Sequence, residues 1–237
     1  MIDFSARSNE IEIMDDLDIQ GDVIPKTLKE LEIINKFLGG NHVTISGISK
    51  ILDKTRPLTN TLKIADMGCG GGDMLKLISV WAVKNNIDIK LRGIDANQNI
   101  IDYARENTRG FHNIEFTTGN VFNLDEDPNE YDIIICTLFL HHFSQEESIH
   151  LLSNWYNKSR LGVVVNDLHR HPVAYHSIKF LTRVLSKSYM VKNDAPLSVL
   201  RAFSKKDLKL ILEKSGIANY QLKWEWAFRW KLVIIKE

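Results

Sequence analysis

The sequence predicts an α/β fold in which helices cover both faces of a mostly parallel, doubly wound sheet. Apolar strand patterns alternate with helical patterns through five successive strands, which is typical of a parallel sheet. The first of these strands runs directly into a glycine-rich turn, and the chain closes on two aromatic-rich strands that suit an antiparallel hairpin. At 237 residues the chain is long enough for one such domain with additions.

The region before the first core strand, residues 1–59, is expected to be an N-terminal helical extension. Residues 1–20 are polar and acidic and are expected to be irregular. A helix begins at Pro25 and ends at the glycine pair 39–40, because its apolar residues recur at helical spacing and proline suits a first turn. A second, shorter helix is expected over 46–52. Both helices either cap the carboxyl ends of the strands or simply support the sheet.

The core domain, residues 60–237, is expected to alternate strands and helices without an internal repeat. A capping box formed by Ser144 and Glu147 marks the start of one helix. The expected strands are 62–65, 88–95, 113–119, 132–137 and 160–166, and the expected helices between them are 74–83, 98–107 and 145–158.

The chain carries an insertion after the fifth strand, at about 172–203, which is expected to form a lid. Its first half has the pattern of an amphipathic helix, and its second half, 193–203, is expected to be an ordered loop. Ser204 then caps a helix that ends at Gly216. The last two expected strands, 220–226 and 228–235, form the hairpin, with a turn near Ala227.

Composition favours a small-molecule partner. Lysine plus arginine and aspartate plus glutamate number 30 each, and the pI is about 7.1, so no basic excess indicates nucleic acid. The start lacks the apolar core of a signal peptide, and no run of about 18 apolar residues suits a membrane span. Cys69 and Cys136 fall at buried or strand-end positions, so we expect no disulfide and a reducing, cytoplasmic setting.

The glycine-rich turn has the chemistry of a ligand cradle. Gly68, Gly70 and Gly72 let the backbone approach a ligand closely, and the free N–H groups of the following helix point into the same crevice. A nicotinamide-dinucleotide fingerprint would need glycine where Asp73 stands. The carboxylate of Asp66, at the strand end, repels a pyrophosphate and can accept hydrogen bonds from an ammonium group. A tight strand-to-helix connection without any ligand is the alternative.

Two further positions extend this cradle. Asp95 ends the second strand, 23 residues beyond Gly72, close to where nucleoside-binding folds place an acceptor for ribose hydroxyls. Its carboxylate can accept from both hydroxyls, although taken alone Asp95 is equally a turn residue. Asn120, Val121 and Phe122 follow the third strand.

These motifs resemble those of the class I S-adenosylmethionine (SAM) methyltransferases over about residues 60–237. The resemblance rests on Asp66-x-Gly68-x-Gly70-x-Gly72, on Asp95, on the Leu-His-His-Phe segment and on the terminal hairpin. It implies a Rossmann-like, doubly wound sheet of seven strands, SAM as cofactor and S-adenosylhomocysteine as product. The cofactor-binding residues that it implies are Asp66, Gly68, Cys69, Gly70, Gly72, Asp95, Ala96, Asn120, Val121, Phe122, Thr137 and Leu138. Asn120 departs from the family's usual aspartate.

Within that class the chain looks like the methyltransferases that act on quinones, polyketides and other small natural products. It is similar to bacterial members that share an Asn-Asp-Leu-His-Arg strand end, here 166–170, and an Asp-x-Pro-Leu-Ser-Val-x-Arg-Ala-Phe segment, here 194–203. The resemblance implies a small-molecule acceptor and a monomer or homodimer, with no nucleic acid or membrane partner.

Three histidines are candidate general bases. His141, His142 and His169 follow the fourth and fifth strands, where ligands of open α/β sheets bind. Imidazole is suited to take a proton from a phenolic or enolic hydroxyl at neutral pH. Histidines at strand ends also cap helices or bond to backbone, which is the structural alternative. His169 and His171 lack a third ligand at a recognisable spacing, so no metal site is expected.

Three arginines come from different parts of the core. Arg170, Arg201 and Arg229 either converge on an anionic acceptor or pair with Asp167 and Asp194 to hold the lid shut, and we favour the structural pairing.

The sequence therefore predicts a SAM-dependent methyltransferase that acts on a hydroxyl of a small aromatic or polyketide-like molecule. A quinone-type C-methyltransferase and a non-catalytic SAM-binding regulator on the same fold are the alternatives. An NAD-dependent reductase is disfavoured by Asp73.

Overall fold

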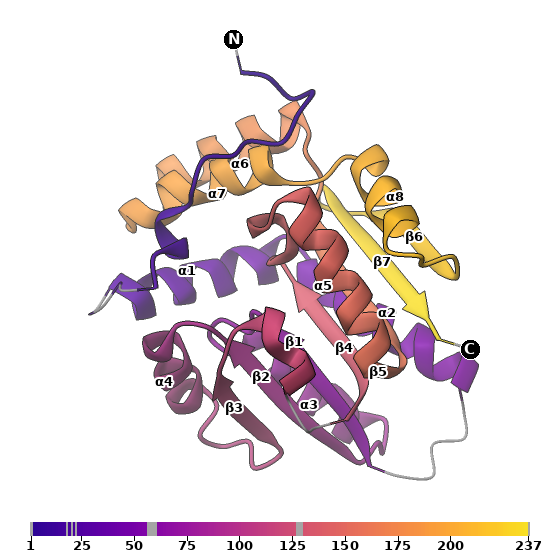
Figure 1. The fold of residues 1–237 in the computed structure, drawn as a ribbon. Helices are drawn as coiled ribbons and strands as arrows, with labels where there is room; N and C mark the ends of the chain where they lie inside the picture. Colours follow the sequence, from indigo (N-terminus) through magenta and orange to yellow (C-terminus); the bar gives the residue numbers. More distant parts are fainter. Residues whose placement is uncertain are drawn as a thin grey trace.

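The computed structural model describes residues 2–17, 19, 21, 23–55, 61–126 and 130–236. A seven-stranded sheet forms its centre, and helices pack on both faces (Figure 1). The strands are β1 (Leu62–Met67), β2 (Ile89–Asp95), β3 (Ile114–Thr118), β4 (Tyr131–Thr137), β5 (Ser159–Leu168), β6 (Tyr220–Glu225) and β7 (Arg229–Ile235). The helices are α1 (Val23–Phe37), α2 (Gly40–Thr55), α3 (Asp73–Lys84), α4 (Gln98–Asn107), α5 (Gln145–Lys158), α6 (Pro172–Leu185), α7 (Tyr189–Arg201) and α8 (Lys205–Lys214), with short 3-10 turns η1 (Ile13–Asp15), η2 (Val121–Glu126) and η3 (Leu140–His142).

The strand order is β3-β2-β1-β4-β5-β7-β6. β1 to β5 pair in parallel, and β7 pairs antiparallel with both β5 and β6. The sheet therefore has the expected class, including the C-terminal hairpin and its turn near Ala227. The order reverses between β1 and β4, and in open α/β sheets ligands bind outside the carboxyl ends of the strands at such a point. The loops after β1 and β4 are thus the place to look for a site.

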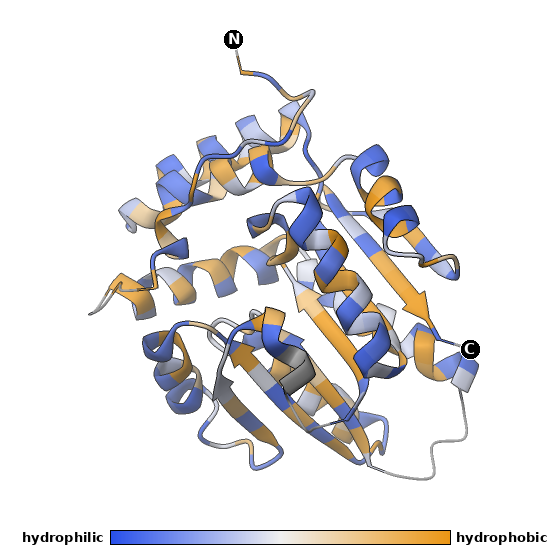
Figure 2. Ribbon diagram, in the orientation of Figure 1, coloured by the Kyte–Doolittle hydropathy of each residue, from blue (hydrophilic) through white to orange (hydrophobic). Residues whose placement is uncertain are grey.

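Each face of the sheet has its own apolar core. On one face α5 and α8 pack through residues such as Trp155 and Leu212, and on the other α2 and α3 pack through Ile48 and Ile78. Figure 2 shows apolar residues concentrated in the central strands, while the outward side of α5 is hydrophilic. This division explains why the central strands are apolar at nearly every position, since both of their faces are covered.

The sequence left open whether the two N-terminal helices cap the carboxyl ends of the strands or support the sheet, and each helix fits a different one of these alternatives. α2 supports the sheet, because its Ile48, Ile51 and Leu52 are fully buried in the core shared with β1 and β5. α1 instead lies across the carboxyl ends, where Leu28, Ile34 and their neighbours line a cavity. The expected span of the second helix was wrong, because α2 begins at Gly40 rather than at residue 46.

The expected loop at 193–203 was also wrong, because residues 193–201 belong to helix α7. Ser188 caps that helix by accepting from the N–H of Val191. Pro196 lies inside the helix, where it normally costs stability, and it indicated a loop at the sequence level. Buried contacts of Met190, Val191 and Leu197 outweigh that cost, and α7 packs against α6 as the outer layer seen in Figure 1.

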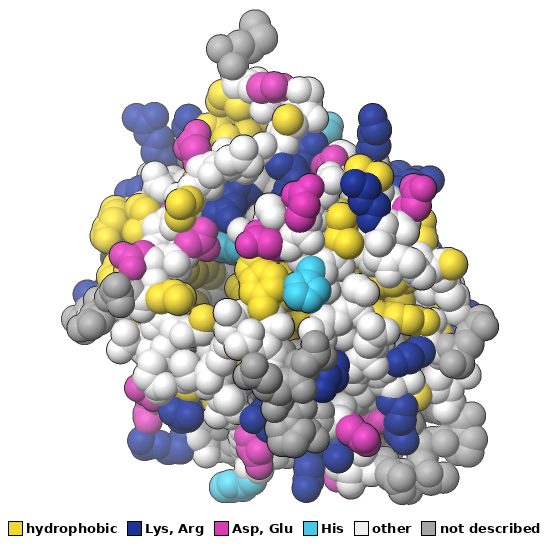
Figure 3. Space-filling model, in the orientation of Figure 1, with side chains coloured by type: hydrophobic (Ala, Val, Ile, Leu, Met, Phe, Trp, Pro, Cys, Tyr) yellow, Lys and Arg dark blue, Asp and Glu magenta, His cyan; other side chains and the backbone are white. Residues whose placement is uncertain are grey.

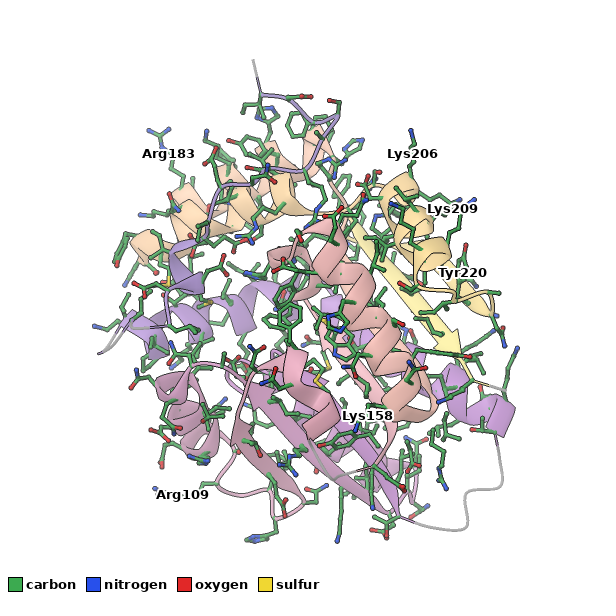
Figure 4. All side chains as sticks on the ribbon, in the orientation of Figure 1. Arg109, Lys158, Arg183, Lys206, Lys209 and Tyr220 are labelled. Atoms are coloured by element: carbon green, nitrogen blue, oxygen red, sulfur yellow. The ribbon has the colours of Figure 1, made fainter. Side chains whose placement is uncertain are left out.

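The exposed face in Figure 3 carries acidic and basic side chains intermixed, as the balanced composition predicts. Arg183 on α6 and Lys206 and Lys209 on α8 extend outward from the body of the molecule (Figure 4). Among the described residues no helix is long and apolar enough to cross a membrane.

Candidate functional site

A cavity of about 1260 Å³ opens at the carboxyl ends of β1 and β4, at the point where the strand order reverses. Its walls come from α1, from the loops after β1, β2 and β4, and from α6 and α7. The N-terminal segment around η1 and the start of β7 complete the lining. Most binding pockets are mainly apolar with a few polar groups that fix orientation, and the polar groups here gather in three places.

The first polar group is the glycine turn after β1. Gly68 has a φ of 69°, and a Cβ there would meet the Phe139 ring at 2.1 Å, so only glycine fits. Asp66 precedes it with 2% of its surface exposed, and its Oδ1 has no hydrogen-bond partner. Burial, and then the charge of Asp95, raises the pKa of Asp66 well above its ordinary value. A buried acceptor oxygen on the cavity wall is thus open to a ligand donor.

Asp95 holds the other side of the same turn. Its Oδ2 accepts from the N–H of Gly70 at 3.2 Å and its Oδ1 from the N–H of Asn97 at 3.1 Å. Burial raises the pKa of this carboxyl, although those backbone hydrogen bonds oppose the shift. Each oxygen keeps a free lone pair, so the carboxylate can still accept from two ligand hydroxyls.

The other expected cofactor residues fall into two sets. Gly72 and Phe122 do not line the cavity: Gly72 precedes α3 with a φ of 75°, and Phe122 packs edge-on to Phe143 at 5.3 Å. The remaining ones do line it, and they are Cys69, Gly70, Ala96, Asn120, Val121, Thr137 and Leu138, together with Asp66, Gly68 and Asp95. The Oδ1 of Asn120 accepts from the N–H of Phe122 at 3.0 Å.

The second polar group is a pair of histidines in η3. His141 and His142 lie with their ring centroids 4.4 Å apart, and both line the cavity. His141 is 2% exposed, and its Nδ1 lies 2.6 Å from Oδ1 of Asp167. His142 is more open, and its Nδ1 bonds to Oδ1 of Asp15. A carboxylate on Nδ1 orients the ring and leaves Nε2 as the nitrogen that can take a proton.

Glu12 joins this pair and was not expected from the sequence. Its side chain is 4% exposed, with Oε1 3.7 Å from Nε2 of His141 and Oε2 3.9 Å from Nε2 of His142. The Ser198 hydroxyl donates to Oε2 at 2.8 Å. Burial raises the pKa of Glu12 to about 7, against the lowering effect of His142. An acid that titrates near neutrality therefore lies beside both candidate bases.

The N-terminal segment is fixed in place by contacts with distant residues. Arg7 donates to the carbonyls of His141 and Phe143 at 2.8 and 2.7 Å. The Asp194 carboxylate of α7 accepts from the N–H groups of Ile13 and Met14, both at 3.0 Å. Contacts between residues more than a hundred positions apart leave no periodic pattern in the sequence from which they could be predicted. The acidic cluster around Met14 is the one feature of this segment that the sequence shows.

Glu12, His141 and His142 also meet the geometric requirement for holding a metal, since their ligand atoms lie within 4.8 Å of one another. The sequence predicted no metal, and this stays a prediction. Arg201 places its Nη1 2.5 Å from Oδ2 of Asp15 and 3.7 Å from Oε1 of Glu12.

His169 lies outside the cavity lining, unlike the two histidines of η3. Its Nδ1 accepts from the indole N–H of Trp224 at 3.2 Å, and its ring packs on Trp230. Burial, followed by the charges of His171 and Arg170, lowers its pKa. The structure therefore separates His169 from the pair with which the sequence grouped it.

The three arginines do not converge. Arg170 pairs with Asp207 at 2.9 Å, and Arg201 pairs with Asp15. Asp167 and Asp194 bond elsewhere, to His141 and to the backbone of η1, so the expected pairing with the arginines is wrong. Arg229 alone lines the cavity without an acid partner among the described residues, and it forms the third polar group.

Known proteins resemble this chain in part of its sequence and in its fold. Residues 64–162 match the model of a methyltransferase domain. The plantazolicin methyltransferase BpumL, solved with S-adenosylhomocysteine, superposes with a TM-score of 0.61 at 19% identity over 86% of this chain and 74% of that one. The magnesium protoporphyrin IX methyltransferase ChlM of Synechocystis PCC 6803 gives 0.55 at 16% identity, over 86% and 87%. The chain thus shares the fold of these methyltransferases, and its residues 64–162 match a methyltransferase domain.

The curated relatives are matched over a shorter stretch of the chain. The ubiquinone/menaquinone biosynthesis C-methyltransferase UbiE of Campylobacter jejuni is 35% identical over 78 residues. That alignment covers 32% of this chain and spans about a third of the relative's length. The matched family model ends within β5, so helices α6, α7 and α8 and the terminal hairpin lie outside it.

Proposed function

We propose that this methyltransferase domain binds SAM at the switch point of the sheet and transfers its methyl group to a hydroxyl of a small molecule. The observation that carries the proposal is one cavity that joins the Asp66–Asp95 cradle to the histidine pair of η3. The solved relatives with S-adenosylhomocysteine share the fold and support the choice of cofactor.

The cradle suits a sulfonium-containing amino acid better than a dinucleotide. Asp66 offers an unpartnered, buried oxygen that can accept from an ammonium group, and Asp95 has lone pairs for two ribose hydroxyls. Two acids in one crevice repel a pyrophosphate. Asn120 and Val121 line the neighbouring wall, where an adenine would lie. We therefore expect SAM and S-adenosylhomocysteine to bind with dissociation constants around the micromolar range and NAD(H) not to bind, as calorimetry can measure.

The reaction requires the acceptor oxygen, the methyl carbon and the sulfur to lie in line. The oxygen attacks the methyl carbon, the carbon–sulfur bond breaks, and the sulfonium becomes a neutral thioether. We propose that Nε2 of His142 takes the hydroxyl proton, because His142 lines the cavity and Asp15 already holds its Nδ1. His141 is more deeply buried, and we propose that it positions the pair through Asp167.

A quinone-type C-methyltransferase is the second candidate. The 35% identity to the Campylobacter C-methyltransferase, over 78 residues, favours it. A carbon acceptor also loses a proton, so the same histidines would serve. The product distinguishes the two, since an ether and a new carbon–methyl bond give different fragmentation in mass spectrometry.

We also propose that α6 and α7 act as the lid of the acceptor side, since both contribute to the cavity wall.

Replacing Asp95 by alanine is expected to weaken S-adenosylhomocysteine binding by about 10- to 100-fold, because it removes two charged hydrogen bonds to the ribose. Titration calorimetry with the exposed Asp53→Ala variant as a charge-matched control measures the effect. An unchanged affinity in Asp95→Ala would remove the ribose assignment.

A further inference from the structure

We propose that Arg229 anchors an anionic group of the acceptor, which makes the acceptor an amphiphilic acid with an apolar body and a carboxylate end. The inference rests on the proposed function and adds the class of substrate. Arg229 begins β7, is 2% exposed and lines the cavity. A buried guanidinium on a cavity wall normally has an acid partner, because an unpaired buried charge is costly.

Arg229 lacks such a partner within the described part of the chain. Its Nη2 donates to the neutral amide oxygen of Asn35 at 2.9 Å, and its Nε and Nη1 have no hydrogen-bond partner. Asp167 is the acid whose charge acts on it, but the oxygens of Asp167 accept from His141 and from the N–H of Leu168. Burial lowers the pKa of Arg229 to about 10, so the side chain stays charged at neutral pH.

The free donors match a carboxylate. Nη1 is buried without a partner and Nη2 uses one of its two hydrogens on Asn35, so the guanidinium keeps donors that would suit the two oxygens of one ligand carboxylate. The wall near Asn35 is apolar, since Leu31, Ile34 and Leu38 line the same cavity. An apolar body that ends in an acid complements this arrangement.

The position of Arg229 separates it from the cofactor cradle. β7 and β1 are three strand spacings apart in the order β1-β4-β5-β7, which is roughly 14 Å at about 4.8 Å per strand. The carboxylate of SAM, whose amino group we place at Asp66, therefore does not reach Arg229 when the sulfonium lies between the cradle and His142. The anion at Arg229 belongs to the acceptor.

The test uses two probes with the same ring, 2-naphthoate and the uncharged 2-naphthalenemethanol, with S-adenosylhomocysteine present. Calorimetry of the wild-type protein should give at least about tenfold tighter binding of the naphthoate. Arg229→Met should lose about 10- to 100-fold of naphthoate affinity and leave the alcohol unchanged. Arg183→Met, on the outward side of α6 (Figure 4), is the charge-matched control and should bind both probes as the wild type does.

Stability supplies a second readout. Removing an unpaired buried charge should raise the melting temperature of ligand-free Arg229→Met by a few degrees, whereas a structural arginine would lower it. Arg229→Gln keeps a donor for Asn35 and should show the same loss of naphthoate binding. Equal affinity of the wild type for both probes, or a fall in stability of both variants, would overturn the proposal. Weaker binding of S-adenosylhomocysteine to Arg229→Met would assign the anion to the cofactor, whereas failure of the wild type to bind it contradicts the proposed function itself.

Discussion

His142→Gln lowers the rate of methyl transfer to a phenolic hydroxyl by about 10²- to 10⁴-fold and leaves S-adenosylhomocysteine affinity near that of the wild type. Glutamine keeps the size and polarity of the side chain but cannot take the acceptor proton. The measurement is release of S-adenosylhomocysteine with a series of substituted phenols of rising pKa. The loss should grow along the series, because a phenol that is already ionised needs no base and its rate should fall tenfold or less.

Two controls separate catalysis from folding. His169→Gln should retain most of the activity, because His169 lies outside the cavity and bonds to Trp224. His150→Gln, on the exposed side of α5, should also be active. A loss in His142→Gln that stays constant along the phenol series would show that the site works by orientation alone. A greater loss of activity in His169→Gln than in His142→Gln would identify His169, which follows β5, as the base.

Much of the fold could be predicted because its signals are local. The helices at 98–107 and 145–158 begin and end where the sequence predicted, since Asn97 and the Ser144–Glu147 capping box fix their first turns. The glycine turn after β1 follows from conformations that only glycine adopts freely. The parallel core follows from runs of apolar residues that need cover on both faces.

What escaped prediction depends on contacts between distant residues. Pro196 and Asp194 indicate a loop locally, yet Asp194 caps η1 and the apolar residues around Pro196 are buried. Glu12 reaches the histidines across almost 130 positions, and no spacing rule connects them. Arg229 is a strand residue that is buried without an acid partner among the described residues. The sequence could not predict this, because it depends on which side chains pack around the guanidinium.

The stability of the protein should depend on pH through Glu12. Its folded-state pKa is about 7, raised by burial from an ordinary value of 4.5. Below pH 4.5 the carboxyl is protonated in both states and has no effect. Between these values the unfolded chain releases the proton first, so the free energy of unfolding falls as pH rises, by about 3 kcal/mol in total. Above about pH 7 the carboxyl is ionised in both states, and the free energy of unfolding falls no further through this group.

Glu12→Gln should remove this dependence, because glutamine resembles the protonated acid and does not titrate. We expect the variant to match the wild type at about pH 4 and to be up to about 3 kcal/mol more stable at about pH 8, measured by urea denaturation across that range. Glu10→Gln, exposed in the same segment, is the matched control and should follow the wild type. If Glu12→Gln keeps the wild-type slope, or loses stability at pH 8, then Arg201 and the two histidines stabilise the Glu12 anion more than burial opposes it.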